Sequence, residues 1–217
     1  MTEAVFFDLD GTLADTAPDF ALILHRMQRE QGCTPTPFDI LRTQVSHGVR
    51  GMLGVGFGVT QDDRAYASLA QRFLDLYADG LCVKTSLFPG MAELLDALER
   101  RGIRWGVVTN KPERYTHPLI AALGLATRSA CVVGGDTAPR AKPHPDPLLH
   151  ACNAAGVKPA HCLYVGDDIR DITAGKAAGM RTLAAAYGYL GDAHPIDTWG
   201  ADAIIGHPLD ILCHLET

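Results

Sequence analysis

The sequence predicts an α/β protein built on a doubly wound parallel sheet, with an all-helical domain inserted after the first strand. Two observations lead to this prediction. Short, continuously apolar segments alternate with helical segments along most of the chain, which is the pattern of a parallel sheet covered by helices on both faces. One long segment, 16–83, breaks the alternation because it contains helical patterns and no strand.

The predicted strands are apolar throughout and do not alternate with polar residues, as expected for strands buried on both faces. They cover 4–10, 104–110, 130–136, 162–168, 181–187 and 202–206. The predicted helices between and after them cover 91–101, 114–123, 145–155, 169–178 and 209–215. A strand followed by a helix, repeated in this way, predicts parallel strands joined by helical crossovers.

The segment 16–83 contains two amphipathic helical patterns. The first has Thr16 and Pro18 as start signals, Gly32 as a stop signal, and an apolar stripe formed by Phe20, Ile23, Leu24 and Met27. The second has an apolar stripe formed by Tyr66, Leu69, Phe73, Leu76 and Tyr77. We therefore expect a core formed by 1–15 and 84–217 and a helical cap formed by 16–83.

The composition limits the possible partners and location. The 217 residues have a formal net charge of −6 and no basic run, so nucleic acid or an anionic membrane is not the expected partner. Acidic residues interrupt the first apolar run, so no secretory signal is predicted, and no apolar run has the length of a membrane span. The six cysteines lie far apart without a C-x-x-C motif, which predicts free thiols in the cytoplasm.

Carboxylates gather where predicted strands end, and the carboxyl ends of parallel strands form the usual ligand site. Asp8 and Asp10 end the first strand two positions apart, so they would point to the same face. Asp167 ends another strand of the same sheet. Two such charges 4 Å apart repel by about 4 kcal/mol at an effective dielectric constant near 20. A divalent cation would relieve this repulsion, and Mg²⁺ suits oxygen ligands that share a site with phosphate.

Four motifs in chain order resemble the haloacid dehalogenase superfamily, in its phosphatase branch. They are "DLDGT" (8–12), "VVTN" (107–110), Lys142 in "KPHPDP", and "GDDIRD" (166–171). The resemblance spans nearly the whole chain and implies a Rossmann-like core with a helical cap placed after the first strand. Dehalogenases of the superfamily usually lack the second aspartate of the first motif, so Asp10 favours a phosphatase.

The resemblance also implies roles for individual residues. Asp8 would be the nucleophile that forms an aspartyl-phosphate, and Asp10 the general acid for the leaving alcohol and then the base for water. Thr109 and Lys142 would act on the transferring phosphoryl group. Phosphate would be bound by Gly11, Thr109, Asn110 and Lys142.

The same resemblance implies a magnesium site and a substrate site. Asp8, Asp167 and the backbone carbonyl of Asp10 would hold Mg²⁺, and Asp171 would orient neighbouring groups. Asp168 would do the same or would only cap a helix. The candidates for substrate specificity are Ser46, His47, Arg50 and Lys111; a solvated Arg50 is an equally good interpretation.

Longer segments such as "WGVVTNKPERYTHPLI" and "YVGDDIRDITAGKAAGMRT" resemble bacterial phosphoglycolate phosphatases and the related N-acetylmuramic acid 6-phosphate phosphatases. Both substrates join a phosphomonoester to a carboxylate. We therefore expect a small, carboxylate-bearing phosphorylated metabolite of the phosphoglycolate type, with the muramic acid derivative as the alternative. A hexose-phosphate phosphomutase of the same fold and a catalytically inactive interaction protein also remain open, as do monomer and homodimer.

Overall fold

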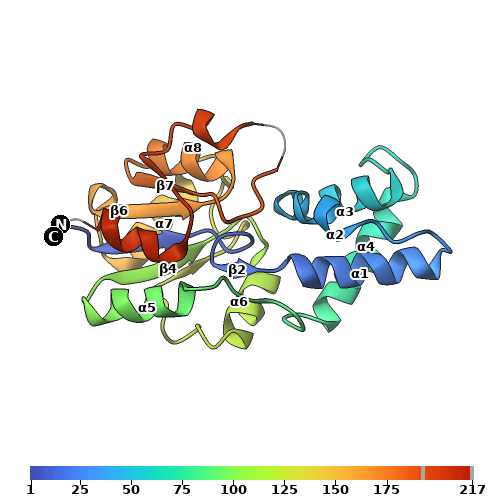
Figure 1. Ribbon diagram of the computed structural model, residues 1–217, viewed down its shortest axis with the longest axis horizontal. Helices are drawn as coiled ribbons and strands as arrows, with labels where there is room; N and C mark the ends of the chain where they lie inside the picture. The colour runs from blue at the N-terminus through green and yellow to red at the C-terminus, as the bar shows by residue number, and fades with distance from the viewer. Residues whose placement is uncertain (192–193, 216–217) are drawn as a thin grey trace.

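A computed structural model describes residues 1–191 and 194–215 and contains a six-stranded sheet (Figure 1). The strand order is β5–β4–β1–β6–β7–β8, and every neighbouring pair is parallel. The strands are β1 (Ala4–Phe7), β4 (Arg104–Val108), β5 (Val132–Val133), β6 (Cys162–Gly166), β7 (Arg181–Ala185) and β8 (Ala203–Ile205). The predicted parallel sheet is confirmed, with each strand shorter than predicted.

Helices cover both faces of the sheet, which is why its strands are apolar throughout. They are α5 (Met91–Arg100), α6 (Glu113–Ala122), α7 (Asp146–Ala155), α8 (Ile169–Ala177) and the short η2 (Pro159–His161), η3 (Ile196–Thr198) and η4 (Pro208–His214). Side chains of β1 alternate between two buried clusters: Val5 and Phe7 pack in the one that contains α5, and Phe6 packs in the one that contains α7. The predicted doubly wound fold is confirmed.

The first strand ends before its carboxylates. The sequence predicts a strand over 4–10, but β1 ends at Phe7 and the chain then turns. The amide groups of Leu13 and Ala14 both donate to the carbonyl of Leu9, at 3.1 and 2.9 Å. Asp8 and Asp10 therefore lie on a compact loop, and strand alternation does not set their directions.

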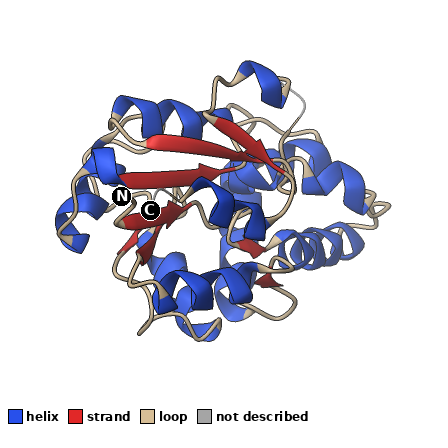
Figure 2. Ribbon diagram, turned by 60° about the vertical axis from the view of Figure 1, so that its left-hand side comes forward, coloured by secondary structure: helices blue, strands red, loops and turns tan. Residues whose placement is uncertain are grey.

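The inserted segment forms a separate group of helices beyond the carboxyl end of the sheet, at the right of Figure 1 and again distinct in Figure 2. They are α1 (Ala17–Glu30), α2 (Phe38–Arg42), η1 (Val45–His47), α3 (Gly48–Phe57) and α4 (Tyr66–Asp79). All four stripe residues predicted for α1 are buried. The ring of Phe20 lies 5.6 Å from that of Phe73 and 4.9 Å from that of Tyr77, so aromatic packing joins α1 to α4.

A two-stranded antiparallel ribbon, not predicted from the sequence, connects the helical group to the sheet. It pairs β2 (Ala14–Asp15) with β3 (Ser86–Leu87). Asp19, buried near the start of α1, accepts hydrogen bonds from the backbone amides of Val83, Lys84 and Thr85 and from the Thr85 hydroxyl. One carboxylate thus fixes the returning chain. The predicted division into a core (1–15 and 84–217) and a cap (16–83) stays a prediction. The predicted core includes residues 192–193 and 216–217, which lie outside the described part of the chain.

Two further features concern the lengths of the helices and the cysteines. None of the helices in the described part of the chain is both long and apolar enough to cross a bilayer. All six cysteines are free thiols, and the sulfurs of Cys152 and Cys162 lie 3.9 Å apart.

Candidate active site

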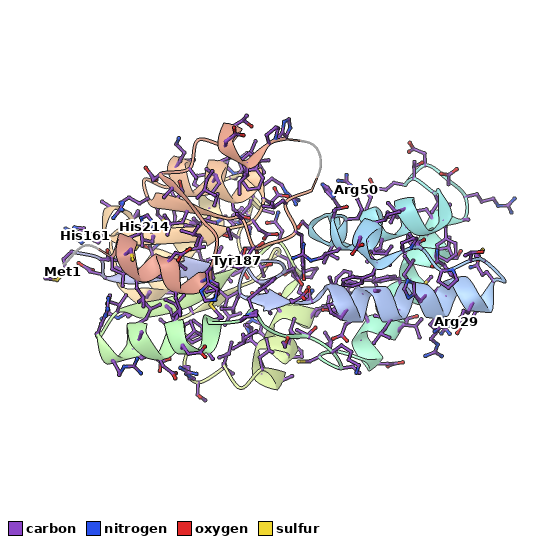
Figure 3. All side chains as sticks on the ribbon, in the orientation of Figure 1. Met1, Arg29, Arg50, His161, Tyr187 and His214 are labelled. Atoms are coloured by element: carbon purple, nitrogen blue, oxygen red, sulfur yellow. The ribbon has the colours of Figure 1, made fainter. Side chains whose placement is uncertain are left out.

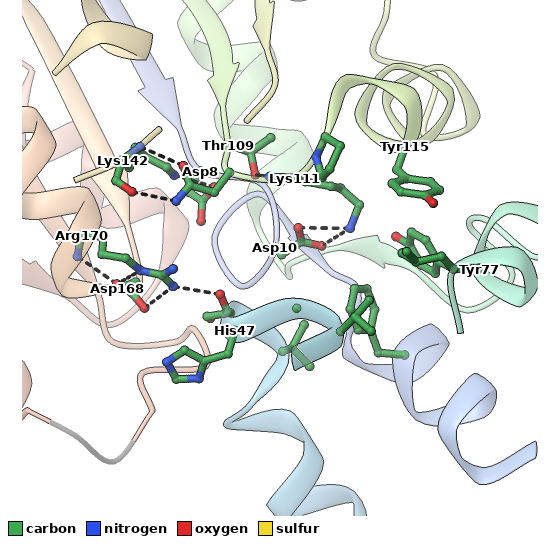
Figure 4. A pocket seen from close by; sticks show the side chains of 18 of the residues that line it. Asp8, Asp10, His47, Tyr77, Thr109, Lys111, Tyr115, Lys142, Asp168 and Arg170 are labelled. Carbon is green, nitrogen blue, oxygen red and sulfur yellow. Dashed lines mark hydrogen bonds and ion pairs between the residues drawn. The ribbon is translucent and has the colours of Figure 1, made fainter. Parts of the chain in front are cut away.

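A cavity of about 330 Å³ lies between the carboxyl ends of the strands and the inserted helices (Figure 4). Polar side chains from the segments after β1, β4, β5 and β6 form the wall on the sheet side, and aromatic and aliphatic side chains form much of the wall on the helical side. The sheet-side residues are Asp8, Asp10, Thr109, Asn110, Lys111, Lys142, Asp168, Arg170 and Asp171; the helical residues include Phe20, Val45, Ser46, His47, Phe73 and Tyr77.

Lys142 forms the positive centre of the sheet side. Its ammonium lies 2.6 Å from Asp171 Oδ1, 2.8 Å from Tyr164 Oη, 2.9 Å from Asp8 Oδ1 and 3.0 Å from Val108 O. Three N–H groups thus face four oxygens, and Asp8 Oδ1 has the ion pair but no hydrogen bond. Burial lowers the pKa of Lys142, but the charges of Asp171 and Asp8 outweigh it and raise the pKa above its usual value.

Three carboxylates cluster beside Lys142. Asp8, Asp167 and Asp171 each offer one oxygen, and these oxygens lie within 4.8 Å of one another. Asp167 is fixed by the hydroxyl of Thr12 and the amide of Tyr189, both at 2.8 Å. Its burial, with the charges of Asp8 and Asp171, raises its pKa well above the usual value. This set of hard oxygen donors with excess negative charge fits a magnesium ion.

Gly11 permits the close approach of the β1 loop to Asp167. Its φ is +88°, and a Cβ there would lie 2.2 Å from Asp167 Oδ2. Only glycine combines this backbone conformation with the space available. The geometry thus places Gly11 against the carboxylate cluster, and its predicted contact with phosphate stays a prediction.

Asp10 points toward different partners from Asp8. Its carboxylate accepts hydrogen bonds from Lys111 Nζ, at 2.9 and 3.2 Å, and from Thr16 Oγ1 at 2.6 Å. The hydroxyl of Thr16 therefore serves Asp10 and does not cap α1. Asp8 and Asp10 face the same cavity from two positions on the loop, each beside its own lysine. The predicted ligation of Mg²⁺ by the Asp10 backbone carbonyl stays a prediction.

The segment after β4 contributes polar groups to the cavity. Thr109 Oγ1 accepts from the amide of Lys111 at 3.2 Å, which leaves its O–H available to the cavity. The amide side chain of Asn110 instead binds the backbone of Lys142 in both directions, at 2.9 and 3.0 Å. Asn110 therefore positions Lys142, and the phosphate contact predicted for it stays a prediction.

Asp168 caps the N-terminus of α8, which is one of the two roles that the sequence predicts for it. Its carboxylate accepts from the amide of Arg170, and its own amide donates to Asp171 Oδ2. The Arg170 guanidinium grips both oxygens of Asp168 at 2.8 Å and also donates to the carbonyl of Ser46 in the helical segment at 2.8 Å (Figure 4). Asp168 thus holds an arginine that links the sheet side to the helical side.

The predicted substrate residues are not all brought together. Ser46, His47 and Lys111 line the cavity. Burial, with the nearby charge of Arg170, lowers the pKa of His47. Arg50 is exposed at the upper margin of the helical group (Figure 3) and lines two neighbouring cavities instead. The structure thus separates Arg50 from the carboxylate cluster, because α3 carries it beyond His47.

Sequence reasoning missed several residues of the cavity. Arg170 lies inside the quoted "GDDIRD" motif, so its charge was the available signal. Tyr164 was not predicted because its contact with Lys142 depends on the packing of β6 against the loop that carries the lysine. The helical spacing of Phe20, Phe73 and Tyr77 predicts buried stripe residues of the cap. They are buried, and they also form part of the cavity wall.

The fold and the site define a class of protein: an α/β hydrolytic enzyme with a carboxylate–lysine centre at the carboxyl ends of a parallel sheet. Residues 5–185 match the model of the haloacid dehalogenase-like hydrolase family. The chain therefore belongs to the haloacid dehalogenase-like hydrolase family. The family and the fold predicted from the four motifs are confirmed.

Named relatives of the chain are phosphatases. It is 44% identical over 217 residues to the N-acetylmuramic acid 6-phosphate phosphatase of Pseudomonas aeruginosa, covering 99% of this chain and 95% of that protein. It is 45% identical over 206 residues to the phosphoglycolate phosphatase of Xanthomonas campestris, covering 94% and 92%. A predicted phosphoglycolate phosphatase from Haemophilus somnus, seen in a crystal structure, shares 28% identity with a TM-score of 0.86, covering 99% of this chain and 98% of that one.

Proposed function

We propose that the chain is a magnesium-dependent phosphomonoester hydrolase that works through an aspartyl-phosphate on Asp8. The observation that carries the proposal is the position of Asp8: its carboxylate faces the cavity and lies 2.9 Å from the ammonium of buried Lys142, beside the carboxylates of Asp167 and Asp171. The proposal is also supported by relatives that are named phosphatases and that align with nearly the whole chain.

The reaction has two displacements at phosphorus. A carboxylate oxygen of Asp8 forms a bond to phosphorus while the ester P–O bond breaks, and Asp10 gives its proton to the leaving oxygen. Asp10 then takes a proton from water, whose oxygen bonds to phosphorus as the P–O bond to Asp8 breaks. Thr109 donates a hydrogen bond to a phosphoryl oxygen, and Lys142 supplies positive charge beside it.

The carboxylate cluster is the proposed magnesium site. Asp8 and Asp167 would bind the ion together with the Asp10 backbone carbonyl, and Asp171 would orient Lys142 beside them. A bound Mg²⁺ would supply positive charge for the phosphoryl oxygens. We expect a chelator such as EDTA to abolish turnover of an aryl phosphate and added Mg²⁺ to restore it, as measured by phosphate release. Full turnover in the presence of EDTA would contradict the magnesium site.

The proposed substrate is a small phosphate ester of the phosphoglycolate type that bears a carboxylate. Lys111 and Arg114 line the cavity and supply positive charge away from Lys142. In this proposal the helical segment 16–83 acts as a cap that selects the substrate, because its side chains form the wall opposite the carboxylate cluster.

N-acetylmuramic acid 6-phosphate is the second candidate, and the size of the cavity favours it. About 330 Å³ lies within the range of sites that hold whole small molecules, roughly 300–1,000 Å³, and much of the helical wall is apolar. A sugar with an acetamide and a carboxylate would use this space more fully than phosphoglycolate. The kcat/KM values of the purified protein with Mg²⁺ for phosphoglycolate, N-acetylmuramic acid 6-phosphate and a hexose phosphate decide between them.

Replacement of the proposed acid should depend on the leaving group. We expect Asp10→Asn to lower kcat about 10²–10⁴-fold for alkyl phosphates, whose alkoxide must be protonated as it leaves. Aryl phosphates should lose less in the first displacement, because a phenolate leaves without a proton. The measurement is kcat for both ester types, with phosphorylation of Asp8 followed in single turnover. Equal losses of phosphorylation rate for the two types would contradict the acid role.

A further inference from the structure

Tyr77 has a buried hydroxyl with no hydrogen-bond partner. The residue lies on α4, is 2% exposed and lines the cavity. Its Oη is one of three buried side-chain atoms in the described part of the chain that lack a hydrogen bond; the others belong to Asp8 and Ser46. Leaving a buried hydroxyl unpaired costs roughly 1–3 kcal/mol, so its position at the cavity calls for a partner that enters from outside.

The neighbours of this hydroxyl define what the partner must be. Lys111 Nζ lies 4.7 Å from the centroid of the Tyr77 ring and 4.9 Å from that of Phe20, and the two centroids are 4.9 Å apart, so the ammonium lies against both rings (Figure 4). An ammonium has only donors, so it cannot accept from the Tyr77 O–H. Lys111 Nζ donates to the carboxylate of Asp10 and also interacts with the oxygen of Tyr77, so the O–H of Tyr77 is the group left without an acceptor, and the positive charge of Lys111 lines the cavity beside it.

We infer that Tyr77 Oη and Lys111 Nζ together form a receptor for a carboxylate oxygen on the part of the substrate away from phosphorus. This inference rests on the proposed phosphatase function. It deepens that function by naming a residue of the helical segment that binds the carboxylate of the substrate. One oxygen of the carboxylate accepts from the Tyr77 hydroxyl and from Lys111. Tyr77 is then a specificity residue that was not among the candidates expected from the sequence.

The surrounding charges favour a carboxylate over a neutral oxygen. Arg114, whose guanidinium lies 4.8 Å from the centroid of the Tyr115 ring, adds a second positive charge at the same wall. Burial raises the pKa of Tyr77 to about 12, so the hydroxyl keeps its proton near neutral pH and can act as a donor. Hydrogen bonds to charged acceptors contribute about twice as much as neutral ones, and more in a site from which water is excluded.

The test removes only this hydroxyl and compares substrates with and without the carboxylate. The pairs are phosphoglycolate with ethyl phosphate, in which a methyl group replaces the carboxylate, and N-acetylmuramic acid 6-phosphate with N-acetylglucosamine 6-phosphate, which lacks the lactyl group that carries the carboxylate. We expect Tyr77→Phe to lower kcat/KM for the carboxylate member roughly tenfold to a hundredfold and to change it less than about twofold for the other member. Tyr66→Phe, on the same helix outside the cavity, is the matched control and should change neither.

A second measurement separates binding from a structural role. Because the hydroxyl is unpaired in the free protein, Tyr77→Phe should leave the Tm without substrate unchanged or raised. A marked fall in Tm would show that the hydroxyl has a partner within the fold and would overturn the inference.

The inference and the function can fail separately. If the wild-type protein with Mg²⁺ hydrolyses none of these esters, the proposed function fails. If it hydrolyses them, but Tyr77→Phe affects both members of a pair equally or affects neither, the receptor is wrong and the phosphatase stands.

Discussion

Asp8→Asn is expected to lower kcat for every phosphate ester by on the order of 10⁴-fold or more, a loss typical of removing a nucleophile. The amide has nearly the shape of the carboxylate, so the loop after β1 and its contact with Lys142 should remain. It cannot attack phosphorus, however, and no neighbouring carboxylate of the cluster can replace it, because Asp167 and Asp171 are held by hydrogen bonds from Thr12, Tyr189 and Lys142.

The fold of this variant should be intact and no less stable. Asp8 is one of three clustered carboxylates, two of which pair with Lys142, so removing its charge relieves repulsion. The control is Asp136→Asn, since Asp136 follows β5, accepts from the amide of Glu113 and does not line the cavity. Circular dichroism and thermal unfolding should match the wild type for both variants. Activity of Asp8→Asn within tenfold of the wild type would contradict the nucleophile role.

Lys142→Met should abolish turnover and also destabilise the fold. The ammonium is buried, and it compensates Asp8 and Asp171, whose side chains are 14% and 1% exposed. Methionine fills a similar volume but leaves these carboxylates without a counter-charge. Breaking a buried ion pair from one side costs about 3–5 kcal/mol, and we expect a decrease of this size in the free energy of unfolding, measured by denaturant titration without added metal.

Two comparison variants identify the cause of this loss. Lys142→Met combined with Asp171→Asn leaves fewer unpaired charges and should recover part of the lost stability. Lys158→Met, at an exposed position, should change the free energy of unfolding by less than about 0.5 kcal/mol. If Lys142→Met is as stable as the wild type, or if the double variant is less stable than Lys142→Met, the electrostatic account of Lys142 is wrong.

Much of the fold could be predicted because its causes are local. Continuous apolar strands, amphipathic helices and the break in their alternation at 16–83 are properties of short windows, and they led to the sheet and to the buried stripe of α1. The β2–β3 ribbon could not be predicted in this way. Its strands are two residues long, lie far apart in sequence, and depend on the contacts of Asp19 with the returning chain.

In the candidate site, too, some residues could be predicted from the sequence, whereas their contacts could not. The motifs and strand ends indicated Asp8, Lys142 and Asp167, because parallel topology brings such positions to one edge of the sheet. The partners of these residues were not predictable: Asp10 bonds Lys111, and Asn110 bonds the backbone of Lys142. Such pairings depend on side-chain directions in loops. Tyr77 shows the limit most clearly, since its spacing predicts a core residue and only the packed structure shows its unpaired hydroxyl at the cavity.

The most direct test of the central claim is to trap the phosphorylated enzyme during turnover. Borohydride reduces an aspartyl-phosphate to homoserine, and mass spectrometry of peptides locates the change. We predict conversion of Asp8 alone, dependent on both Mg²⁺ and substrate and absent from Asp8→Asn. Reduction at another carboxylate, or rapid turnover without any modified Asp8, would show that phosphoryl transfer does not pass through this residue.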